Sequence, residues 1–118
     1  MDPLLALTAA KSASAAKAAA ALQASQLPDG SWVDVNYKDQ TRGVWAAATH
    51  LTRLQSMAVA VRSPLSPSVN SSSVLSSVNT GLVFWLQGHF TNPNWYWNEI
   101  GVPQHLADIF LLLEGRVR

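Results

Sequence analysis

The chain has no cysteine, little charge and no long apolar run, and each of these absences excludes a class of protein. Without cysteine it has neither a disulfide framework nor a thiolate metal site. Its formal net charge of +1 provides no broad positive field for nucleic acid or for an anionic membrane surface. No apolar run reaches the roughly 18 residues that a membrane-spanning helix needs. Met1–Pro3 carries an acid where a secretory signal has positive charge, so no signal peptide is visible.

With 118 residues the chain is one small domain at most, or a piece of a larger one. Its hydrophobic content of 48% is that of a globular protein, but its charged content is only 13%. A small free-standing domain exposes much surface for its size and needs charge to keep that surface soluble. We therefore expect part of the surface to pack against something outside this chain.

Three histidines are the candidate metal ligands and acid–base groups: His50, His89 and His105. They lie far apart with no carboxylate at ligand spacing, so we expect polar packing or solvated side chains rather than a metal site. The sequence also has no glycine-rich phosphate loop, no nucleophile elbow and no pair of carboxylates within one turn. It therefore predicts no metal, no cofactor and no catalytic residue in this chain.

Apolar residues recur every three to four positions in several stretches, which is typical of helices that bury one face. The expected helices lie near 4–26, 40–61, 72–87 and 98–114. The first is rich in alanine, and Asp2 is a typical cap for its start. The second is the clearest amphipathic pattern, with these apolar positions: Val44, Ala47, Ala48, Leu51, Leu54, Ala58 and Val61. Together the stretches predict an all-α fold.

Glycine and proline positions, and the distribution of apolar residues along the chain, refine these predicted helix ends. Gly88 and Gly115 are expected to end the last two helices, and Pro103 is tolerable only near a helix start. Ser63–Ser73, rich in proline and serine, is expected to be a rigid connector. The segment 109–113 is apolar on nearly all sides, and a helix like that is buried on several sides in its native context. The predicted helices do not supply enough neighbours, so the chain is expected to be cut short.

The segment between the first two helices combines turn residues with aromatic ones. The residues Leu27–Gly30 predict a turn, because the proline fixes φ and the glycine can adopt a positive φ. The residues that follow alternate between apolar and polar, which favours an extended loop that buries Trp32. Asp34, Asp39 and Arg42 are expected to form a small ion-paired network under this loop rather than a catalytic group.

Asn92–Gln104 is hard to explain by packing alone. Its consecutive rings, Trp95, Tyr96 and Trp97, would fan over most of the circumference of a helix or split between the two faces of a strand. At least one ring must therefore meet solvent, another element or a ligand. Flat rings beside asparagine amides suit a sugar, which offers C–H faces for stacking and hydroxyls for hydrogen bonds. The alternative is that the three rings close the end of a helical core.

Several short sequences, taken in order, resemble those of polysaccharide lyase family 8, the chondroitin AC, hyaluronate and xanthan lyases. The resemblance covers about residues 22–114. It is carried by Leu27-Pro-Asp-Gly-Ser-Trp32, Asp34-Val-Asn-Tyr37, Asp39 with Arg42 and Trp45, His50-Leu51 with Arg53-Leu54, Ser63-Pro-Leu-Ser-Pro67, Gly81-Leu82 with Trp85, and Asn94-Trp-Tyr-Trp-Asn-Glu-Ile-Gly-Val-Pro-Gln104. The last block is the most specific.

The resemblance implies a fold and a context. In that family an incomplete (α/α) toroid of paired helices carries a long cleft, and antiparallel β-domains follow it. The chain is then expected to be a partial toroid of about four helices in two hairpins over 1–118. Its Ala-rich first helix would occupy 1–26 and the family-like region 27–118. The implied partners are an acidic polysaccharide and the remainder of the toroid with its β-domains, and the implied location is extracellular.

The resemblance also implies a binding site without a catalytic one. The family's aromatic patch stacks sugar rings, and the matching positions are Trp95 and Tyr96, where tyrosine replaces the usual second tryptophan. The expected substrate-binding residues are Asn94, Trp95, Tyr96, Trp97 and Asn98. The family reaction is β-elimination beside a uronic acid, performed by an Asn, a His, a Tyr and an Arg. These lie C-terminal to the aromatic block, and none of the histidines here matches.

Two hypotheses of different classes remain open. The first is an N-terminal fragment of a lyase that binds acidic polysaccharides but does not cleave them alone. The second is a non-catalytic helical carbohydrate-binding or scaffold protein that kept only the stacking surface. A terpenoid-type toroid is a weaker third possibility, because the Asp-Gly-Ser-Trp sequence recurs there, but the chain has no Asp-rich metal motif.

Overall fold

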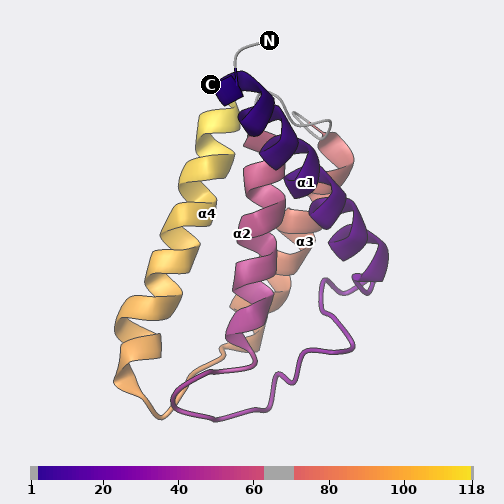
Figure 1. Cartoon of the computed structure of the whole chain (residues 1–118). Coiled ribbons are helices and arrows are strands. Elements are labelled where there is room, and N and C mark those ends of the chain that lie inside the picture. Colours follow the sequence, from indigo (N-terminus) through magenta and orange to yellow (C-terminus); the bar gives the residue numbers. More distant parts are fainter. Residues whose placement is uncertain (1–2, 63–70, 118) are drawn as a thin grey trace.

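The computed structural model describes residues 3–62 and 71–117. Over these residues it is helical and contains no strand, which confirms the predicted all-α class. Consecutive helices run in opposite directions, and the second lies in the middle, in contact with the other three α-helices (Figure 1). The elements are α1 (Pro3–Ser25), α2 (Ala48–Arg62), α3 (Ser72–Gly88), the π-helix η1 (Trp97–Gly101) and α4 (Val102–Val117).

Helix α1 packs through small side chains, as its alanine-rich sequence predicts. Ala16 and Ala19 are buried where α1 crosses the bundle, and it contacts α2 and α3. Alanine buries little apolar area, so packing alone attaches α1 weakly. Hydrogen bonds just after the helix add to the contact between α1 and the rest of the bundle. The Gln26 side chain donates to the carbonyl of Gly30 at 3.0 Å and to that of Ser77, on α3, at 3.1 Å. The predicted cap Asp2 lies outside the described residues, as does most of the predicted connector Ser63–Ser73.

The predicted start of the second helix, near residue 40, is wrong. Helix α2 begins at Ala48, and Val44, which the helical pattern placed on the buried face, is 88% exposed. The physical reason is that the carbonyl groups of residues 41–43 accept hydrogen bonds from side chains beyond residue 90. They are therefore not used in an i to i+4 helical ladder. From Ala48 onward the predicted apolar face is buried.

Helix α3 has clear signals at both ends. Ser71 precedes it, and its hydroxyl accepts the N–H of Val74 at 3.2 Å, which satisfies one of the unpaired donors of the first turn. At the other end Gly88 is still helical, and the left-handed residue is His89, with φ of 50°. The predicted stop at Gly88 is therefore displaced by one residue. The next ring, Phe90, packs so closely on Gly88 that a Cβ there would clash with it.

The core is built around the middle helix and the loop 26–47. Trp32 and Trp45 are each 2% exposed, and the burial of Trp32 is as predicted. The Trp32 indole donates to the carbonyl of Leu22 at 3.0 Å, and the Trp45 indole donates to that of Asp39 at 2.8 Å. The largest fully buried side chains that accompany them are Leu51, Leu54, Met57, Ile109, His50, Val61 and Val78.

The last helix opens with a widened turn. In η1 the N–H of Val102 bonds to the carbonyl of Trp97, five residues earlier. Pro103 is the second residue of α4, near the helix start as predicted, and it has no N–H to tighten the preceding turn. Gly101 leaves room for an indole, because a Cβ there would lie 2.6 Å from the ring of Trp97. Gly115 does not end this helix, which runs to Val117.

One face of α4 is not covered by the other helices. Ile109 is fully buried against the bundle, but Phe110 is 47% exposed and Leu111 is 66% exposed. An open groove of about 420 Å³ lies between α2 and α4, lined by Gln55, Val59, Arg62, Asp108, Leu111 and Leu112. No helix within the described ranges is long and apolar enough to cross a membrane.

Candidate functional site

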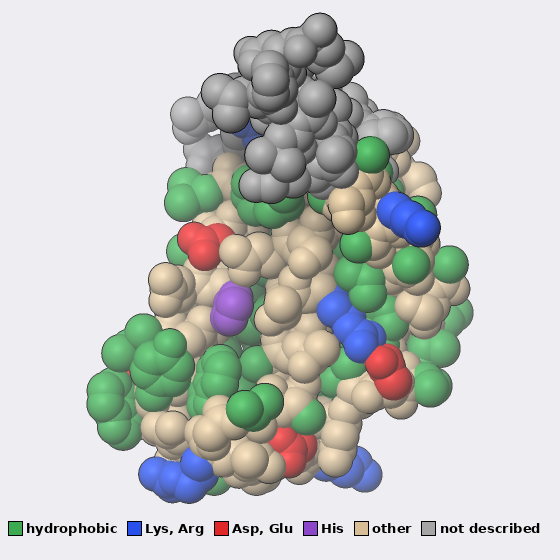
Figure 2. Space-filling model, in the orientation of Figure 1, with side chains coloured by type: hydrophobic (Ala, Val, Ile, Leu, Met, Phe, Trp, Pro, Cys, Tyr) green, Lys and Arg blue, Asp and Glu red, His purple; other side chains and the backbone are tan. Residues whose placement is uncertain are grey.

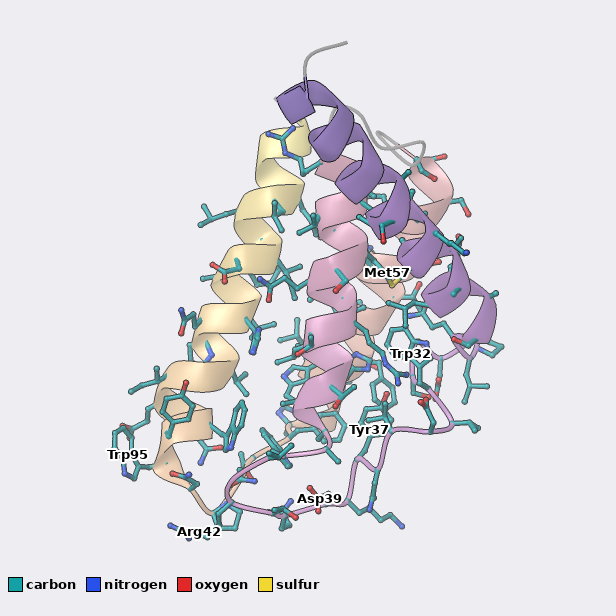
Figure 3. The ribbon with its side chains drawn as sticks, viewed as in Figure 1. Trp32, Tyr37, Asp39, Arg42, Met57 and Trp95 are labelled. Atoms are coloured by element: carbon teal, nitrogen blue, oxygen red, sulfur yellow. The ribbon has the colours of Figure 1, made fainter. Side chains whose placement is uncertain are left out.

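The predicted site residues lie in one turn at the end of the bundle where the loop 26–47 passes. We call residues 92–98 the aromatic turn, which follows α3 and includes the first two residues of η1 (Figure 3). Its backbone is closed by a reciprocal amide pair. The N–H of Asn92 donates to Oδ1 of Asn98 at 2.8 Å, and Nδ2 of Asn98 donates to the carbonyl of Asn92 at 2.7 Å. The turn is therefore held in one shape by hydrogen bonds between its two ends.

Asn94 extends this arrangement to the first residues of the next helix. Its Oδ1 accepts the N–H of Tyr96 at 3.1 Å, which is the contact of a helix-capping side chain. Its own N–H donates to Oδ1 of Asn92 at 2.8 Å. Asn92 is 4% exposed, so this network is partly sealed from water. The two asparagines on either side of Pro93 thus fix the direction in which the rings leave the turn.

The loop 39–43 holds the aromatic turn from the other side. Nδ2 of Asn92 donates to the carbonyl of Thr41 at 2.9 Å, and Nδ2 of Asn94 donates to that of Arg42 at 2.9 Å. The Trp97 indole donates to the carbonyls of Arg42 and Gly43, each at 3.2 Å. The turn therefore rests on a platform of backbone carbonyls, which explains why this loop is not helical.

The three rings have different surroundings. Trp97 is half-buried, with its ring centroid 5.8 Å from that of the buried Trp45. Tyr96 meets Trp97 edge to face at 5.5 Å, yet it is 43% exposed. Trp95 is 59% exposed and points away from the bundle (Figure 3). Trp97 therefore connects the turn to the core, whereas Trp95 and Tyr96 present ring surface to solvent.

Exposed apolar side chains gather at this end of the molecule. Besides Trp95 and Tyr96, Ile100 is 42% exposed and Val44 is 88% exposed. Figure 2 shows a group of hydrophobic side chains at this lower edge, with a blue cationic side chain next to it. Clustered exposed apolar surface on rigid backbone is typical of a binding site rather than of a core. The alternative, that all three rings close a helical core, fits Trp97 alone.

The amides predicted to bind a ligand already have partners in the protein. The hydrogen bonds of Asn94 and Asn98 leave each amide with one N–H and one lone pair not used in the described contacts. Both asparagines position the rings. Their direct role in ligand binding, like that of Trp97, stays a prediction.

A second polar network lies beneath the loop and involves His50, which is fully buried on α2. The N–H of Trp32 donates to the hydroxyl of Tyr37 at 3.0 Å, and that hydroxyl lies 2.8 Å from Nδ1 of His50. Nε2 of His50 faces the carbonyl of Gly81 at 2.8 Å, so Nε2 carries the proton and Nδ1 accepts the tyrosine O–H. Burial lowers the pKa of His50 and raises that of Tyr37. This confirms polar packing for His50.

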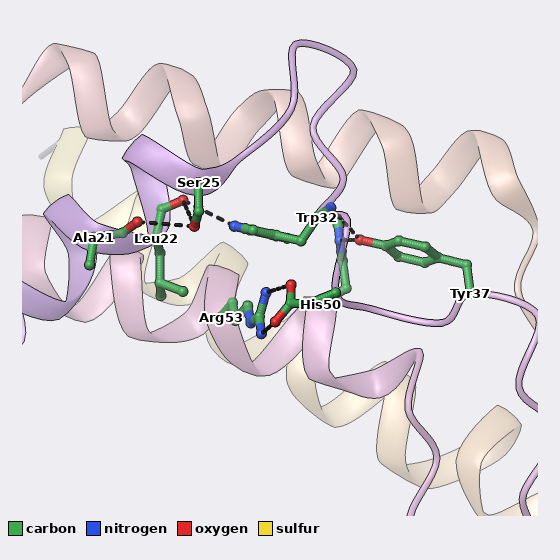
Figure 4. A network of polar contacts seen from close by, with 8 residues as sticks. Ala21, Leu22, Ser25, Trp32, Tyr37, His50 and Arg53 are labelled. Carbon is green, nitrogen blue, oxygen red and sulfur yellow. Dashed lines mark hydrogen bonds and ion pairs between the residues drawn. The ribbon is translucent and has the colours of Figure 1, made fainter.

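The predicted ion-paired network of Asp34, Asp39 and Arg42 is wrong. Asp34 pairs instead with Arg53 through two contacts of 2.8 and 2.6 Å, and the Arg53 guanidinium lies 5.3 Å from the Trp32 ring centroid (Figure 4). Hydrogen bonding by Arg53 lowers the pKa of Asp34. Asp39 accepts the N–H of Ala46 at 2.9 Å, which with other local hydrogen bonds lowers its pKa. Arg53 lies nineteen positions from Asp34, and Ala46 lies seven positions from Asp39.

Sequence reasoning missed two features of the site. The first is the role of Arg42, whose side chain donates to the carbonyl of Pro93 at 3.3 Å. The second is the role of Asn92, which bonds to Asn98 at the other end of the aromatic turn and to the carbonyl of Thr41 in the loop. The sequence Asn92-Pro-Asn94 was an available signal, because asparagines next to proline favour side-chain-capped turns. His105 bonds to Gln55 at 2.9 Å and lies outside the site. The described residues contain no group of three His, Cys, Asp or Glu able to hold a metal ion.

Comparison with known proteins agrees with this architecture. The model of the N-terminal alpha-helical domain of polysaccharide lyase family 8 matches residues 1–118. The chondroitinase-AC of Pedobacter heparinus is 31% identical over 86 residues, which is 73% of this chain and 12% of that protein. A solved structure of chondroitinase AC lyase, from work on its oligosaccharide complexes, superposes with a TM-score of 0.80 at 29% identity.

That superposition covers 85% of this chain and 15% of the solved chain. The chain thus spans less than a fifth of the length of either relative, and the family model that it matches describes an alpha-helical domain. The partial toroid implied by the sequence is confirmed. The chain belongs to polysaccharide lyase family 8, as part of its N-terminal alpha-helical domain.

Proposed function

We propose that Trp95 and Tyr96 stack on sugar rings of an acidic, uronic-acid-containing polysaccharide. The observation that carries this proposal is the pair of exposed rings on a turn whose backbone is fixed by Asn92, Asn94 and Asn98. A rigid, exposed ring loses little entropy when a ligand binds. The names of the relatives, a chondroitinase and an enzyme studied with oligosaccharides, support a saccharide ligand.

The strength of such stacking follows from area. Each ring face covers about 60–80 Å² of sugar C–H surface, which at about 25 cal/mol per Å² contributes about 1.5–2 kcal/mol. The entropy lost on association offsets most of this for one chain and one short oligosaccharide. Binding in the millimolar range is therefore expected. In a whole lyase the same contacts hold the substrate in register with the reacting uronate.

We further propose that this chain supplies binding, while β-elimination uses residues outside the described segment. Among the described residues, the histidine–tyrosine pair His50 and Tyr37 is engaged within the protein. His50 has both ring nitrogens bonded in the core, and Tyr37 has its hydroxyl bonded to the same histidine. The exposed face of α4 around Leu111 is proposed to pack against further helices of the toroid, since both relatives are much longer. We also propose that the protein acts outside the cell, because polysaccharides of this kind are extracellular in the family that the chain resembles.

The test is a titration of the chain with a uronate-containing hexasaccharide, followed by NMR chemical shifts. Trp95→Ala should lower the affinity about 10- to 30-fold, the value for one lost ring face. Tyr96→Phe keeps its ring face and should change affinity less than about threefold, the equivalent of half a hydrogen bond. The helical circular dichroism should stay the same in both. Unchanged affinity in Trp95→Ala would contradict the proposal.

A further inference from the structure

We propose that Arg42 selects acidic over neutral saccharides at the Trp95–Tyr96 surface, by pairing its guanidinium with a carboxylate of the bound chain. This inference rests on the proposed function and adds a charge-reading group to it. Stacked rings alone do not distinguish a uronate from a neutral hexose, because both offer the same C–H faces. A specific arginine beside the rings supplies the missing discrimination.

Arg42 is fixed at the edge of the aromatic turn by its backbone and by its side chain. Its carbonyl accepts both the Asn94 amide at 2.9 Å and the Trp97 indole at 3.2 Å. Its Nη1 donates to the carbonyl of Pro93 at 3.3 Å. Figure 3 shows Arg42 and Trp95 at the same end of the bundle, one on the loop and the other before η1. The guanidinium and the rings therefore share one rigid scaffold.

The charge of Arg42 is not neutralised by the protein. In the described part of the chain, Arg53 is paired with Asp34 at 2.6 Å, but Arg42 forms no salt bridge. Asp39, three positions earlier, turns its carboxylate back to Thr41 at 2.7 Å and to the N–H of Ala46. Arg42 is exposed, and only one of its donors has a described side-chain contact. The remaining donors are available to a ligand.

The geometry of a guanidinium suits this role. Its planar fork matches a carboxylate with two parallel N–H···O bonds, which a lysine ammonium does not reproduce. Because the pair is exposed to water, its contribution is that of a surface ion pair, about a two- to fivefold change in affinity. It is screened by salt, whereas stacking on neutral rings is not. Selectivity for acidic sugar should therefore fall as salt concentration rises.

The experiment compares two hexasaccharides that differ only in charge. One contains uronates, and the other is the same compound with its carboxylates reduced to alcohols. The full 118-residue chain is titrated with each, at low and at high salt, as wild type, Arg42→Gln and Arg42→Lys. Lys38→Gln is the matched control, because Lys38 is an exposed cation of the same loop whose side chain has no described contact with the aromatic turn.

Arg42→Gln should lower the affinity for the uronate hexasaccharide about two- to fivefold at low salt and leave the reduced one unchanged. Arg42→Lys should retain part of the preference, and Lys38→Gln should keep all of it. If Arg42→Gln weakens both hexasaccharides equally, or if Lys38→Gln matches it, the inference is overturned while stacking stands. If Trp95→Ala leaves the binding of both hexasaccharides unchanged, or wild type binds neither, the proposed function itself fails.

Discussion

Replacing the buried Trp45 or the exposed Trp95 by alanine should have opposite consequences for stability and binding. Trp45 is 2% exposed, and its ring centroid lies 5.9 Å from that of Trp85. Trp45→Ala removes most of about 250 Å² of buried ring surface and leaves the carbonyl of Asp39 without its donor. The expected cost is about 3–5 kcal/mol. Trp95 is 59% exposed, so Trp95→Ala should lower the free energy of unfolding by no more than about 2 kcal/mol, estimated from the apolar area that is lost.

Urea unfolding followed by circular dichroism measures both values. Since a small domain has a total stability of about 5–15 kcal/mol, Trp45→Ala should fold marginally. Its urea midpoint should fall by about 2–3 M with little change in slope, whereas Trp95→Ala should stay within about 1 M of wild type. Equal losses in the two variants would refute the division into a buried supporting ring and an exposed binding ring.

Two further predictions follow from the core and from α4. His50 is held neutral in the folded chain with its pKa below the ordinary 6.5, so the unfolded chain binds more protons in that range. The contribution of His50 to the free energy of unfolding should therefore be fully present above about pH 6.5 and decrease as the pH falls below it. His50→Gln should flatten this pH dependence, which is measured by comparing urea midpoints at pH 7 and pH 5. An unchanged pH slope in that variant would contradict the assignment. Separately, Leu111 is 66% exposed, so Leu111→Lys should reduce concentration-dependent association in analytical ultracentrifugation. Association that persists in Leu111→Lys would assign self-association to another surface.

The helices were predictable because they depend on local patterns. Periodicity placed α3 within one residue at each end, and it identified the buried face of α2 from Ala48 onward. The circumference argument for consecutive aromatic residues also holds, since Trp95 and Tyr96 meet solvent and Trp97 meets the core. These results need only the side-chain directions along one helix.

What the sequence did not predict depends on contacts between distant residues. The start of α2 was displaced because its expected first carbonyls bind side chains more than fifty positions later. Arg42 was assigned to an ion pair with nearby aspartates, but its side chain reaches Pro93. Pairing of Asp34 with Arg53, nineteen positions away, was equally invisible. A local pattern cannot choose among partners that only the folded chain brings together.

The most direct test of the sugar-stacking surface is the indole region of the chain's NMR spectrum. The five tryptophans give five indole N–H signals, and Trp95→Phe assigns the one at the aromatic turn. On titration with the uronate hexasaccharide, the Trp95 signal should shift most and that of Trp97 less. Those of Trp32, Trp45 and Trp85 should stay in place, because these rings are no more than 3% exposed. Saturating shifts confined to the buried indoles, or none at all, would contradict the account.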